Sequence, residues 1–393
     1  MDVIHSDHCD TTSVAEWLVG GARSAAEPPQ VLAELCARLL TCGVPLWRVA
    51  VLVRTLHPEV IGRRFLWQFG AEVEMFTAPY EVLETQEYRD SPFAWVLRSG
   101  VALRRRLADP ECVLDFPILA DLREEGATDY LVTPLFFTDG SIHLATWSTQ
   151  QPGGFTDTQL AGLEAVITPL SRVSEIRALR RTATVLLQTY VGANAGERIL
   201  NGQIRRGHSE AIDAAIWLSD MRGFTAAADR LEPEVVIDLL NRYFDCQVPA
   251  ILEARGEVLK FMGDGLLAIF PIDGGDPVPV CERALAAAFA ARERISLLKA
   301  PAGPAGGDGV RFGLALHVGQ VLYGNIGGGN RLDFTCIGPA VNLAARLEKL
   351  AGKLGRTIVA SGDFAVHCPG ALAPIGEFEV AGFSAAQTVF GAP

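Results

Sequence analysis

The chain has few basic residues for its length and no long apolar run. Its 393 residues include 34 Lys and Arg against 46 Asp and Glu, a formal net charge of −12. This acidic balance argues against nonspecific binding to nucleic acid or to an anionic membrane, because both favour a surplus of cations. No stretch approaches the roughly 20 apolar residues of a membrane-spanning helix, so no membrane segment is expected.

Cysteine is also sparse and unpatterned. Eight cysteines lie mostly isolated in apolar or helical contexts, without the spacing of a disulfide framework or a metal site. The residues Met1–Asp7 lack the basic-then-apolar order of a secretion signal. We therefore expect a protein of a reducing cytoplasm. With 49% hydrophobic and 20% charged residues, the chain has a globular composition and the length for two domains.

The most informative residues are two aspartates that each stand beside a glycine near the end of an apolar run. Asp220 follows the strand-like run Ala214–Leu218 and precedes a helix-like stretch. Asp264 lies in a Gly-Asp-Gly turn between two apolar runs, which is typical of a β-hairpin. If the strand lies beside the hairpin, both carboxylates project from one sheet edge and can hold divalent cations, as phosphoryl chemistry needs. Taken singly, each aspartate also fits a plain alternative, a helix N-cap or an Asp-Gly turn.

The segments Leu218–Thr225 and Lys260–Gly265 resemble the catalytic domain of the class III nucleotidyl cyclases, the adenylate and guanylate cyclases. The resemblance runs from about Glu210 to the C-terminus. It implies that Asp220 and Asp264 bind two metal ions, Mg²⁺ or Mn²⁺. It also implies a reaction in which the ribose 3′-hydroxyl of a nucleoside triphosphate attacks the α-phosphorus in line and expels pyrophosphate.

The residues after Asp220 suit the phosphates of such a substrate. A helix N-terminus is a ready phosphate site, and here the backbone amides are those of Arg222, Gly223, Phe224 and Thr225. One position departs from the family, which usually has a phosphate-binding lysine where this chain has Ala381. The absent contact is worth roughly 1.5–3 kcal/mol, enough to weaken triphosphate binding without abolishing it. Arg222 or another basic side chain could substitute.

Two further positions concern the purine base. In this family the residue three before the Gly-Asp pair is lysine in adenylate cyclases and an acid in guanylate cyclases, and here it is Lys260. A lysine only donates hydrogen bonds, which suits the bare N1 of adenine and clashes with the N1–H of guanine. Its partner position is Thr335, where many members carry Asp, and a hydroxyl can accept from the adenine amine. The resemblance therefore implies ATP rather than GTP, while a solvated strand charge is the plain alternative for Lys260.

A third motif follows Gly338. Asn342 and Arg346 are four residues apart, so on a helix they share one face. In the family this Asn orients the ribose and this Arg stabilises charge on the α-phosphate, a task that suits a guanidinium fork. An ordinary amphipathic helix with a polar face is the alternative.

The order of strands and helices in the second half indicates an α+β fold with a mainly antiparallel sheet, and the resemblance implies a ferredoxin-like α/β sandwich. The resemblance also implies an obligate homodimer with two shared active sites. One subunit would supply the metal-binding aspartates, and the other the base-selecting and transition-state residues.

The first half has a different character. We expect an N-terminal segment over 1–27, a regulatory domain over 28–178, a helical linker over 179–207 and the catalytic domain over 208–393. The stretch Glu125–Asp157 resembles a GAF-type sensor domain, which implies an α/β fold and a small-molecule ligand that the sequence does not identify. A regulatory or dimerising domain without a ligand is the alternative. Apolar residues recur at three- and four-residue steps from Leu160 to Leu179, which predicts a helical stalk able to pair with its copy, with Pro169 as a candidate break.

Together these features predict a cytoplasmic, homodimeric adenylate cyclase that makes cyclic AMP from ATP under the control of an N-terminal sensor. Two alternatives stay open. One is a guanylate or dual-specificity cyclase, against which Lys260 argues. The other is a degenerate cyclase domain that serves as a nucleotide-binding or dimerising signalling module, which Ala381 keeps open.

Overall fold

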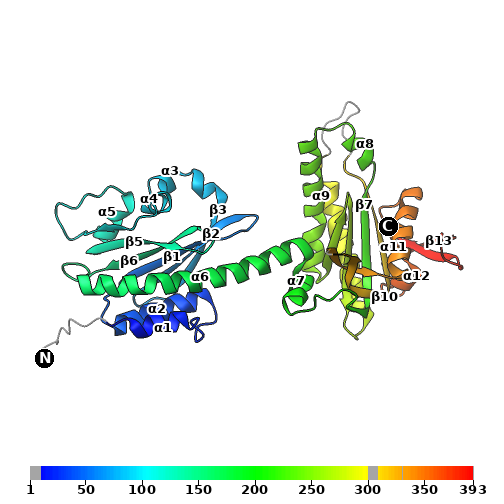
Figure 1. Cartoon of the computed structure of the whole chain (residues 1–393). Helices are drawn as coiled ribbons and strands as arrows, with labels where there is room; N and C mark the ends of the chain where they lie inside the picture. The colour runs from blue at the N-terminus through cyan, green and yellow to red at the C-terminus, as the bar shows by residue number, and fades with distance from the viewer. Residues whose placement is uncertain (1–9, 300–308, 330, 393) are drawn as a thin grey trace. The chain divides into compact units, whose positions relative to one another are not determined.

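The chain divides into two compact units, Met1–Leu186 and Leu187–Pro393 (Figure 1). The computed structural model describes residues 10–299, 309–329 and 331–392. Within these residues no helix combines the length and the apolar character needed to cross a bilayer. The boundary between the units falls inside the range 179–207 that the sequence indicates as a linker.

Unit 1, the N-terminal unit, is built on a six-stranded antiparallel sheet. In spatial order its strands are β3 (Glu74–Pro79), β2 (Val60–Gln68), β1 (Arg48–Arg54), β6 (Ile142–Thr149), β5 (Asp129–Phe136) and β4 (Leu103–Arg105). One face packs against α1 (Thr12–Val19), α2 (Pro28–Thr41) and the first part of α6 (Asp157–Val191). The other face packs against α4 (Pro92–Ser99) and α5 (Pro117–Glu124). The short helices η1 (Tyr80–Glu84) and α3 (Gln86–Arg89) connect β3 to α4.

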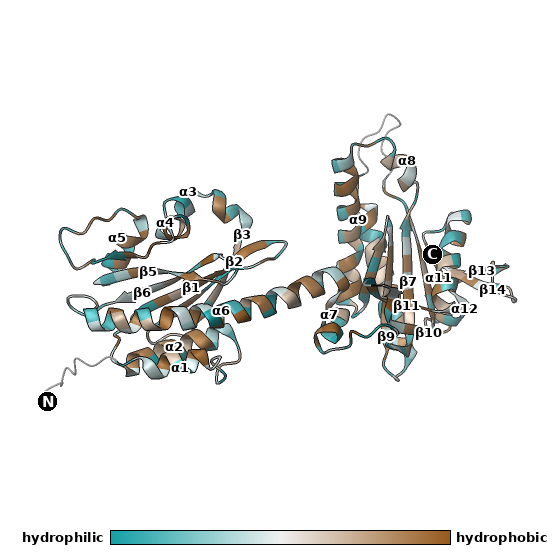
Figure 2. Cartoon of the chain, in the orientation of Figure 1, coloured by the Kyte–Doolittle hydropathy of each residue, from teal (hydrophilic) through white to brown (hydrophobic). Residues whose placement is uncertain are grey.

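Helix α6 continues through Pro169, where the sequence allowed for a break. A proline inside a helix costs about 3 kcal/mol, but Leu163, Val166 and Leu170 are buried in the unit 1 core around it. Packing of this face outweighs the cost of the missing backbone hydrogen bond. Brown and teal segments alternate along α6 (Figure 2). Beyond Val173 its apolar residues emerge from the core, and Ile176 is 64% exposed.

Unit 2, the C-terminal unit, contains an eight-stranded sheet with the order β13-β14-β12-β10-β7-β9-β8, in which β11 pairs with β10. Its strands are β7 (Ser209–Met221), β8 (Glu257–Met262), β9 (Gly265–Ile272), β10 (Phe312–Gly328), β11 (Arg331–Ile337), β12 (Ile358–Ser361), β13 (Ala373–Phe378) and β14 (Gln387–Gly391). Its helices are α7 (Ala193–Leu200), α8 (Phe224–Ala228), α9 (Pro233–Glu253), α10 (Pro277–Ser296), α11 (Pro339–Lys353) and α12 (Gly362–Ala365). The pairing of β10 with β12 is parallel, and the other pairings in this sheet are antiparallel.

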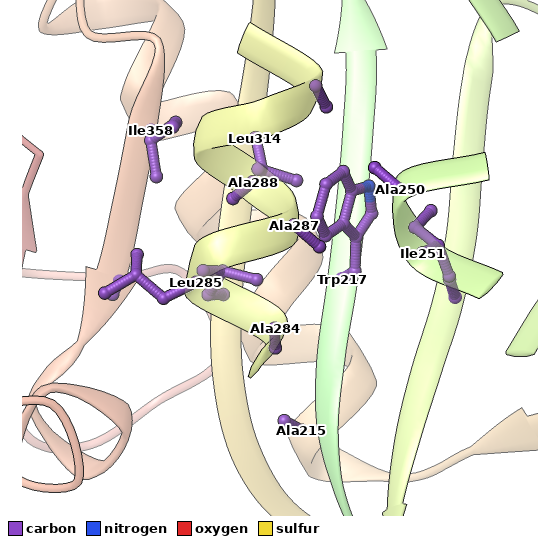
Figure 3. Packing of buried hydrophobic residues seen from close by; sticks show 14 of the residues in the cluster. Ala215, Trp217, Ala250, Ile251, Ala284, Leu285, Ala287, Ala288, Leu314 and Ile358 are labelled. Carbon is purple, nitrogen blue, oxygen red and sulfur yellow. The ribbon is translucent and has the colours of Figure 1, made fainter. Parts of the chain in front are cut away.

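Strand β7 lies in the middle of this sheet because it is apolar on both faces. Trp217 packs with α9 and α10, and Figure 3 shows its indole ring near Ala250 and Ala287. The alternate residue Ile216 faces the opposite core, which includes residues of α7 and α11. A strand covered on both sides reads as a continuous apolar run, which is the pattern of Ala214–Leu218.

Helix α7, which follows α6 along the chain, is tied to the sheet by a buried carboxylate. The hydroxyl of Tyr323 on β10 donates to both oxygens of Glu257, at 2.7 and 2.8 Å. Asn194 on α7 donates to Glu257 Oε2 at 3.2 Å. The Arg198 guanidinium of α7 lies 5.1 Å from the centre of the Tyr323 ring. Because Glu257 opens β8, this cluster links α7 to the strand that carries Lys260.

We expect Tyr323→Phe to lower the free energy of unfolding by about 1–3 kcal/mol, because it removes the main donor to a buried carboxylate. Urea unfolding of the full chain measures the loss. Tyr190→Phe is the matched control, since Tyr190 is 78% exposed. Equal unfolding midpoints for the two variants would contradict this role of Tyr323.

Candidate functional site

Asp220 and Asp264 meet at one edge of the unit 2 sheet. In the pairing of β7 with β9, Ser219 lies opposite Leu266, so Asp220 comes beside the β8–β9 turn that holds Asp264. A Cβ placed on Gly265 would lie 3.3 Å from Asp220 Oδ1, so the carboxylate sits directly against this glycine. Gly263 has φ of +67°, which suits the first central position of a tight hairpin turn.

The two carboxylates interact electrostatically. Burial raises the pKa of Asp220, and the negative charges of Asp264 and Glu348 and a hydrogen bond with Asp264 act in the same direction, so that this pKa reaches about 6. The positive charge of Arg222 acts in the opposite direction. Two partly buried carboxylates held together repel each other when ionised, and a divalent cation between them relieves that repulsion. The donor set therefore fits hard cations such as Mg²⁺ and Mn²⁺.

The pair does not form a complete all-protein metal cage. In the part of the chain that the structure describes, no group of three or more His, Cys, Asp or Glu residues could hold a metal ion. Ions bound at Asp220 and Asp264 need further oxygen ligands from backbone, water or substrate. This is the usual arrangement for Mg²⁺, which is bound through one or two carboxylates together with substrate phosphates.

The Arg222 side chain turns toward α11. Its Nη2 lies 2.8 Å from Glu348 Oε1 and donates to the Glu348 carbonyl at 2.9 Å. A Cβ on Gly313 would lie only 1.8 Å from Nη2, so Gly313 makes room for the guanidinium. The Arg222 backbone N–H donates to the Arg311 carbonyl at 2.8 Å. Sequence reasoning assigned Arg222 to substrate, and the structure shows its side chain and its amide both engaged within the protein.

We expect Arg222→Met to lower the free energy of unfolding by about 2–3 kcal/mol, because it leaves the carboxylate of Glu348 buried without its cation. Urea unfolding measures this, and the double variant Arg222→Met/Glu348→Leu should recover much of the loss. If Arg222→Met instead unfolds like the parent and only raises KM for nucleotide, Arg222 binds substrate as the sequence predicted.

The other predicted phosphate-binding residues come directly after Arg222 in the chain. Gly223 has φ of +76° and caps the short helix α8, which begins at Phe224. Gly223 and Thr225 are exposed, and Phe224 is half-buried against the α9–α10 core.

Lys260 lies on β8 and Thr335 on β11, two strands that contact each other although β8 pairs with β9 and β11 pairs with β10. The positive charge of Lys260 lowers the pKa of Cys336, although burial is the larger effect and raises it to about 11. Lys260 therefore lies close to the residue next to Thr335. The Thr335 hydroxyl is buried and has no hydrogen-bond partner among the described residues. An orphaned buried hydroxyl indicates a place for a polar ligand atom.

Asn342 and Arg346 lie on the exposed face of α11, four residues apart, as the spacing predicts. The opposite face of the helix buries Leu343 and Leu347. Within the described residues no hydrogen bond or ion pair involves the side chain of either Asn342 or Arg346, so none joins them to the aspartate pair. Both groups are thus available to a molecule that approaches α11 from outside the chain.

Sequence reasoning missed Glu348. It is 5% exposed at the side chain, pairs with Arg222 and raises the pKa of Asp220. Its position between the buried Leu347 and Ala351 on the apolar side of α11 is the signal that could have found it, because a buried acid needs a partner.

Comparisons with known proteins agree with this geometry. Residues 208–368 match the family described as the adenylate and guanylate cyclase catalytic domain. The chain is 33% identical over 160 residues to an adenylate cyclase of Anabaena cylindrica, which covers 40% of this chain and 31% of that protein. It is 28% identical over 180 residues to adenylate cyclase 1 of Rhizobium meliloti, covering 45% and 27%. Over residues 208–368, unit 2 is therefore similar to a nucleotide cyclase catalytic domain.

The chain therefore spans less than a third of the length of these two relatives. Among solved structures, the adenylyl cyclase CyaB from P. aeruginosa is 25% identical with a TM-score of 0.39, over 47% of this chain and 96% of that one. The predicted metal, base and ribose residues, from Asp220 to Arg346, all fall inside the matched cyclase domain. Ala381 falls outside it, exposed in the turn between β13 and β14.

Proposed function

We propose that this chain is an adenylate cyclase, which converts ATP to 3′,5′-cyclic AMP and pyrophosphate. The observation that carries the proposal is the convergence of Asp220 and Asp264 at one sheet edge within a cyclase domain. Two relatives named as adenylate cyclases support it. The strand order β10-β7-β9-β8, with α9 and α10 as connecting helices, supports the ferredoxin-like core that the sequence predicted.

Asp220 and Asp264 would hold two Mg²⁺ or Mn²⁺ ions. Such ions, when bound, lower the pKa of an attacking hydroxyl and neutralise phosphate charge. The protein's part is to hold the Asp220 carboxylate against Gly265, beside the turn that carries Asp264, so that the ribose oxygen and the α-phosphorus would be aligned. Gly223, Phe224 and Thr225 offer their backbone amides to the phosphates. In the reaction the bond from O3′ to the α-phosphorus forms, and the bond to the pyrophosphate oxygen breaks.

Lys260 and Thr335 would select adenine. Lys260 donates to the acceptor N1 of adenine, and the unpartnered Thr335 hydroxyl accepts from the N6 amine. Guanine would oppose the Lys260 contact, since it presents an N1–H donor, whereas the Thr335 hydroxyl can also donate to the guanine carbonyl at position 6. The expected preference for ATP over GTP thus depends mainly on Lys260, which can only donate.

The active sites would form between two copies of the chain. Asn342 and Arg346 are exposed, while the aspartate pair lies at the edge formed by β7 and the β8–β9 turn. In a homodimer the Asp pair of one subunit would face the partner's Arg346, which stabilises charge on the α-phosphate. The exposed apolar residues of α6, Ile176 and Leu179, support pairing of the stalk with its copy.

We expect Ala381→Lys to lower KM for ATP about 10-fold, since a single charge-assisted contact is worth roughly 1.5–3 kcal/mol. The matched control is Ala381→Met, which adds a side chain of similar length without charge. Steady-state rates of cyclic AMP formation measure both variants. An unchanged KM in Ala381→Lys would show that the turn between β13 and β14 does not approach the phosphates.

Unit 1 would regulate the cyclase from the cytoplasm, where ATP is available. A cavity in this unit, lined by its sheet and by the segment from η1 to α5, supports a GAF-like sensor that binds a small molecule. The helical linker would carry changes in unit 1 to the aspartates by altering how two copies align.

The test is incubation of the purified full chain with Mn²⁺ and either ATP or GTP, followed by chromatography of the products. Cyclic AMP from ATP, with little cyclic GMP from GTP, supports the proposal. Efficient formation of cyclic GMP would select the guanylate or dual-specificity alternative. ATP binding without turnover would select the degenerate, nucleotide-binding alternative that Ala381 keeps open.

A further inference from the structure

Unit 1 contains a cavity of about 590 Å³. This volume lies within the roughly 300–1,000 Å³ of small-molecule sites. Strands β1 and β2 contribute one side, and η1, α3, α4 and α5 contribute the other. Apolar side chains line much of it, including Leu52, Leu83, Phe93 and Ile118. A ligand of this cavity therefore has a largely apolar body.

Arginines of β1 and β2 face this cavity. Val49, Val51 and Val53 of β1 pack in the core with α2, so the alternate residues Arg48 and Arg54 lie on the opposite face of the sheet. Arg64 of β2 pairs directly across from Leu52, on that same face. All three arginines line the cavity.

Two buried polar groups on this face have no hydrogen-bond partner among the described residues. They are Nε of Arg64, a residue that lines the cavity, and the hydroxyl of Tyr130, a residue outside the cavity lining. Tyr130 and Arg48 both lie opposite Ser148 of β6, one on each side of it. Burial lowers the pKa of Arg64, and the positive charge of Arg48 lowers it further. Burial raises the pKa of Tyr130, and the same charge of Arg48 opposes that rise.

The guanidinium of Arg64 is also held in place. Its carbon atom lies 4.4 Å from the centre of the Phe76 ring, a cation–π contact that orients the group. Arg48 and Arg64 lie close enough to repel each other, and Nε of Arg64 has no acceptor among the described residues, so the strand side of the cavity still needs acceptors. An anion supplies them.

Acidic residues on the helical side limit the charge of such a ligand. Glu125 Oε2 lies 3.7 Å from Arg48 Nη1, which is longer than a hydrogen bond. Asp90 Oδ2 accepts a hydrogen bond from Gln86 Nε2 at 2.8 Å. Glu87 and Asp121 also line the cavity. These carboxylates disfavour a ligand with several negative charges. A single negative charge on the ligand would instead lie on the strand side of the cavity, around Arg48 and Arg64.

We propose that this cavity binds a small organic anion, with one carboxylate or phosphate group held between Arg48 and Arg64 and an apolar body against the helices. The inference rests on the proposed sensor role of unit 1 and gives that sensor a class of ligand. Binding can be measured without turnover, so a failure of the cyclase assay leaves this test intact.

The experiment compares four probes that share a benzene ring: benzoate, phenyl phosphate, benzyl alcohol and benzylamine. Each is titrated into the full chain, with the midpoint of thermal unfolding and calorimetric binding as readouts. We expect one or both anions to bind saturably and to stabilise the protein, and the neutral and cationic probes to do so at least 10-fold more weakly. The comparison of benzoate with phenyl phosphate distinguishes the two anionic groups.

Arg64→Met should weaken binding of the anion about 10- to 100-fold, while Arg98→Met on α4, exposed and outside the cavity, should not change it. Without probe, Arg64→Met should unfold at a higher temperature than the parent, because it removes a buried and repelled charge. Equal binding of benzyl alcohol and the anions would overturn the proposal. So would saturable binding by none of the probes, or a lower unfolding temperature for Arg64→Met without probe.

Discussion

Replacing Asp220 by Asn is expected to lower kcat by about 10³-fold or more. Phosphoryl transfer depends on charge stabilisation by bound metal ions, and a neutral amide binds such ions poorly. Rates of cyclic nucleotide formation at saturating ATP and Mn²⁺ measure the loss. Asp229→Asn is the matched control, since Asp229 is exposed just beyond α8. Asp220→Asn activity above a tenth of the parent's would contradict the role of Asp220.

Misfolding should not explain the loss. In the protein without metal, burial and the neighbouring carboxylates raise the pKa of Asp220, so its ionised form destabilises the fold at neutral pH. Asp220→Asn removes that charge and keeps the shape of the side chain. We therefore expect the variant to unfold at the same temperature as the parent or higher. A marked loss of stability would point to a structural role for the aspartate.

Replacing Lys260 by Glu is expected to reverse the purine preference, changing the ratio of kcat/KM for ATP and GTP by about 10²-fold or more. The carboxylate would accept from the N1–H of guanine and would repel the lone pair on N1 of adenine. Initial rates with each nucleotide give the ratio. Lys299→Glu is the control for a change of net charge, because Lys299 is exposed and follows α10.

The unpartnered hydroxyl of Thr335 is the second group assigned to the purine, so the effect of Lys260→Glu should be confined to the base-binding pocket. If Lys260→Glu lowers the rates with ATP and GTP equally, Lys260 contributes to folding or general binding and not to base choice. If the ratio stays that of the parent, other residues select the purine.

Much of unit 2 could be predicted from the sequence, because its elements carry local signals. The apolar run Ala214–Leu218 lies within β7, and the Gly-Asp-Gly turn forms the β8–β9 hairpin. The four-residue spacing of Asn342 and Arg346 places them on one face of α11. These features depend on residues that are close together in the chain.

Long-range pairings could not be predicted. The Arg222 amide was expected at the phosphates, and its side chain was a candidate substitute for the absent lysine. Only the packing of β10 and α11 shows that Gly313 makes room for the guanidinium beside Glu348. Strand β2 also gave no clear signal, because Gly62, Arg63 and Arg64 interrupt its apolar alternation. Arg64 faces a cavity. The sequence does not show this cavity, because one of its walls forms only when β1 and β2 pair.

Each active site is expected to combine the aspartates of one chain with α11 of another. The direct test mixes Asp220→Ala chains with Arg346→Ala chains, each inactive alone, after unfolding and refolding them together. Random pairing of a symmetric dimer leaves one intact site in each mixed dimer, so activity should return to about a quarter of the parent's. If verified mixed dimers stay inactive, the site is not shared between subunits.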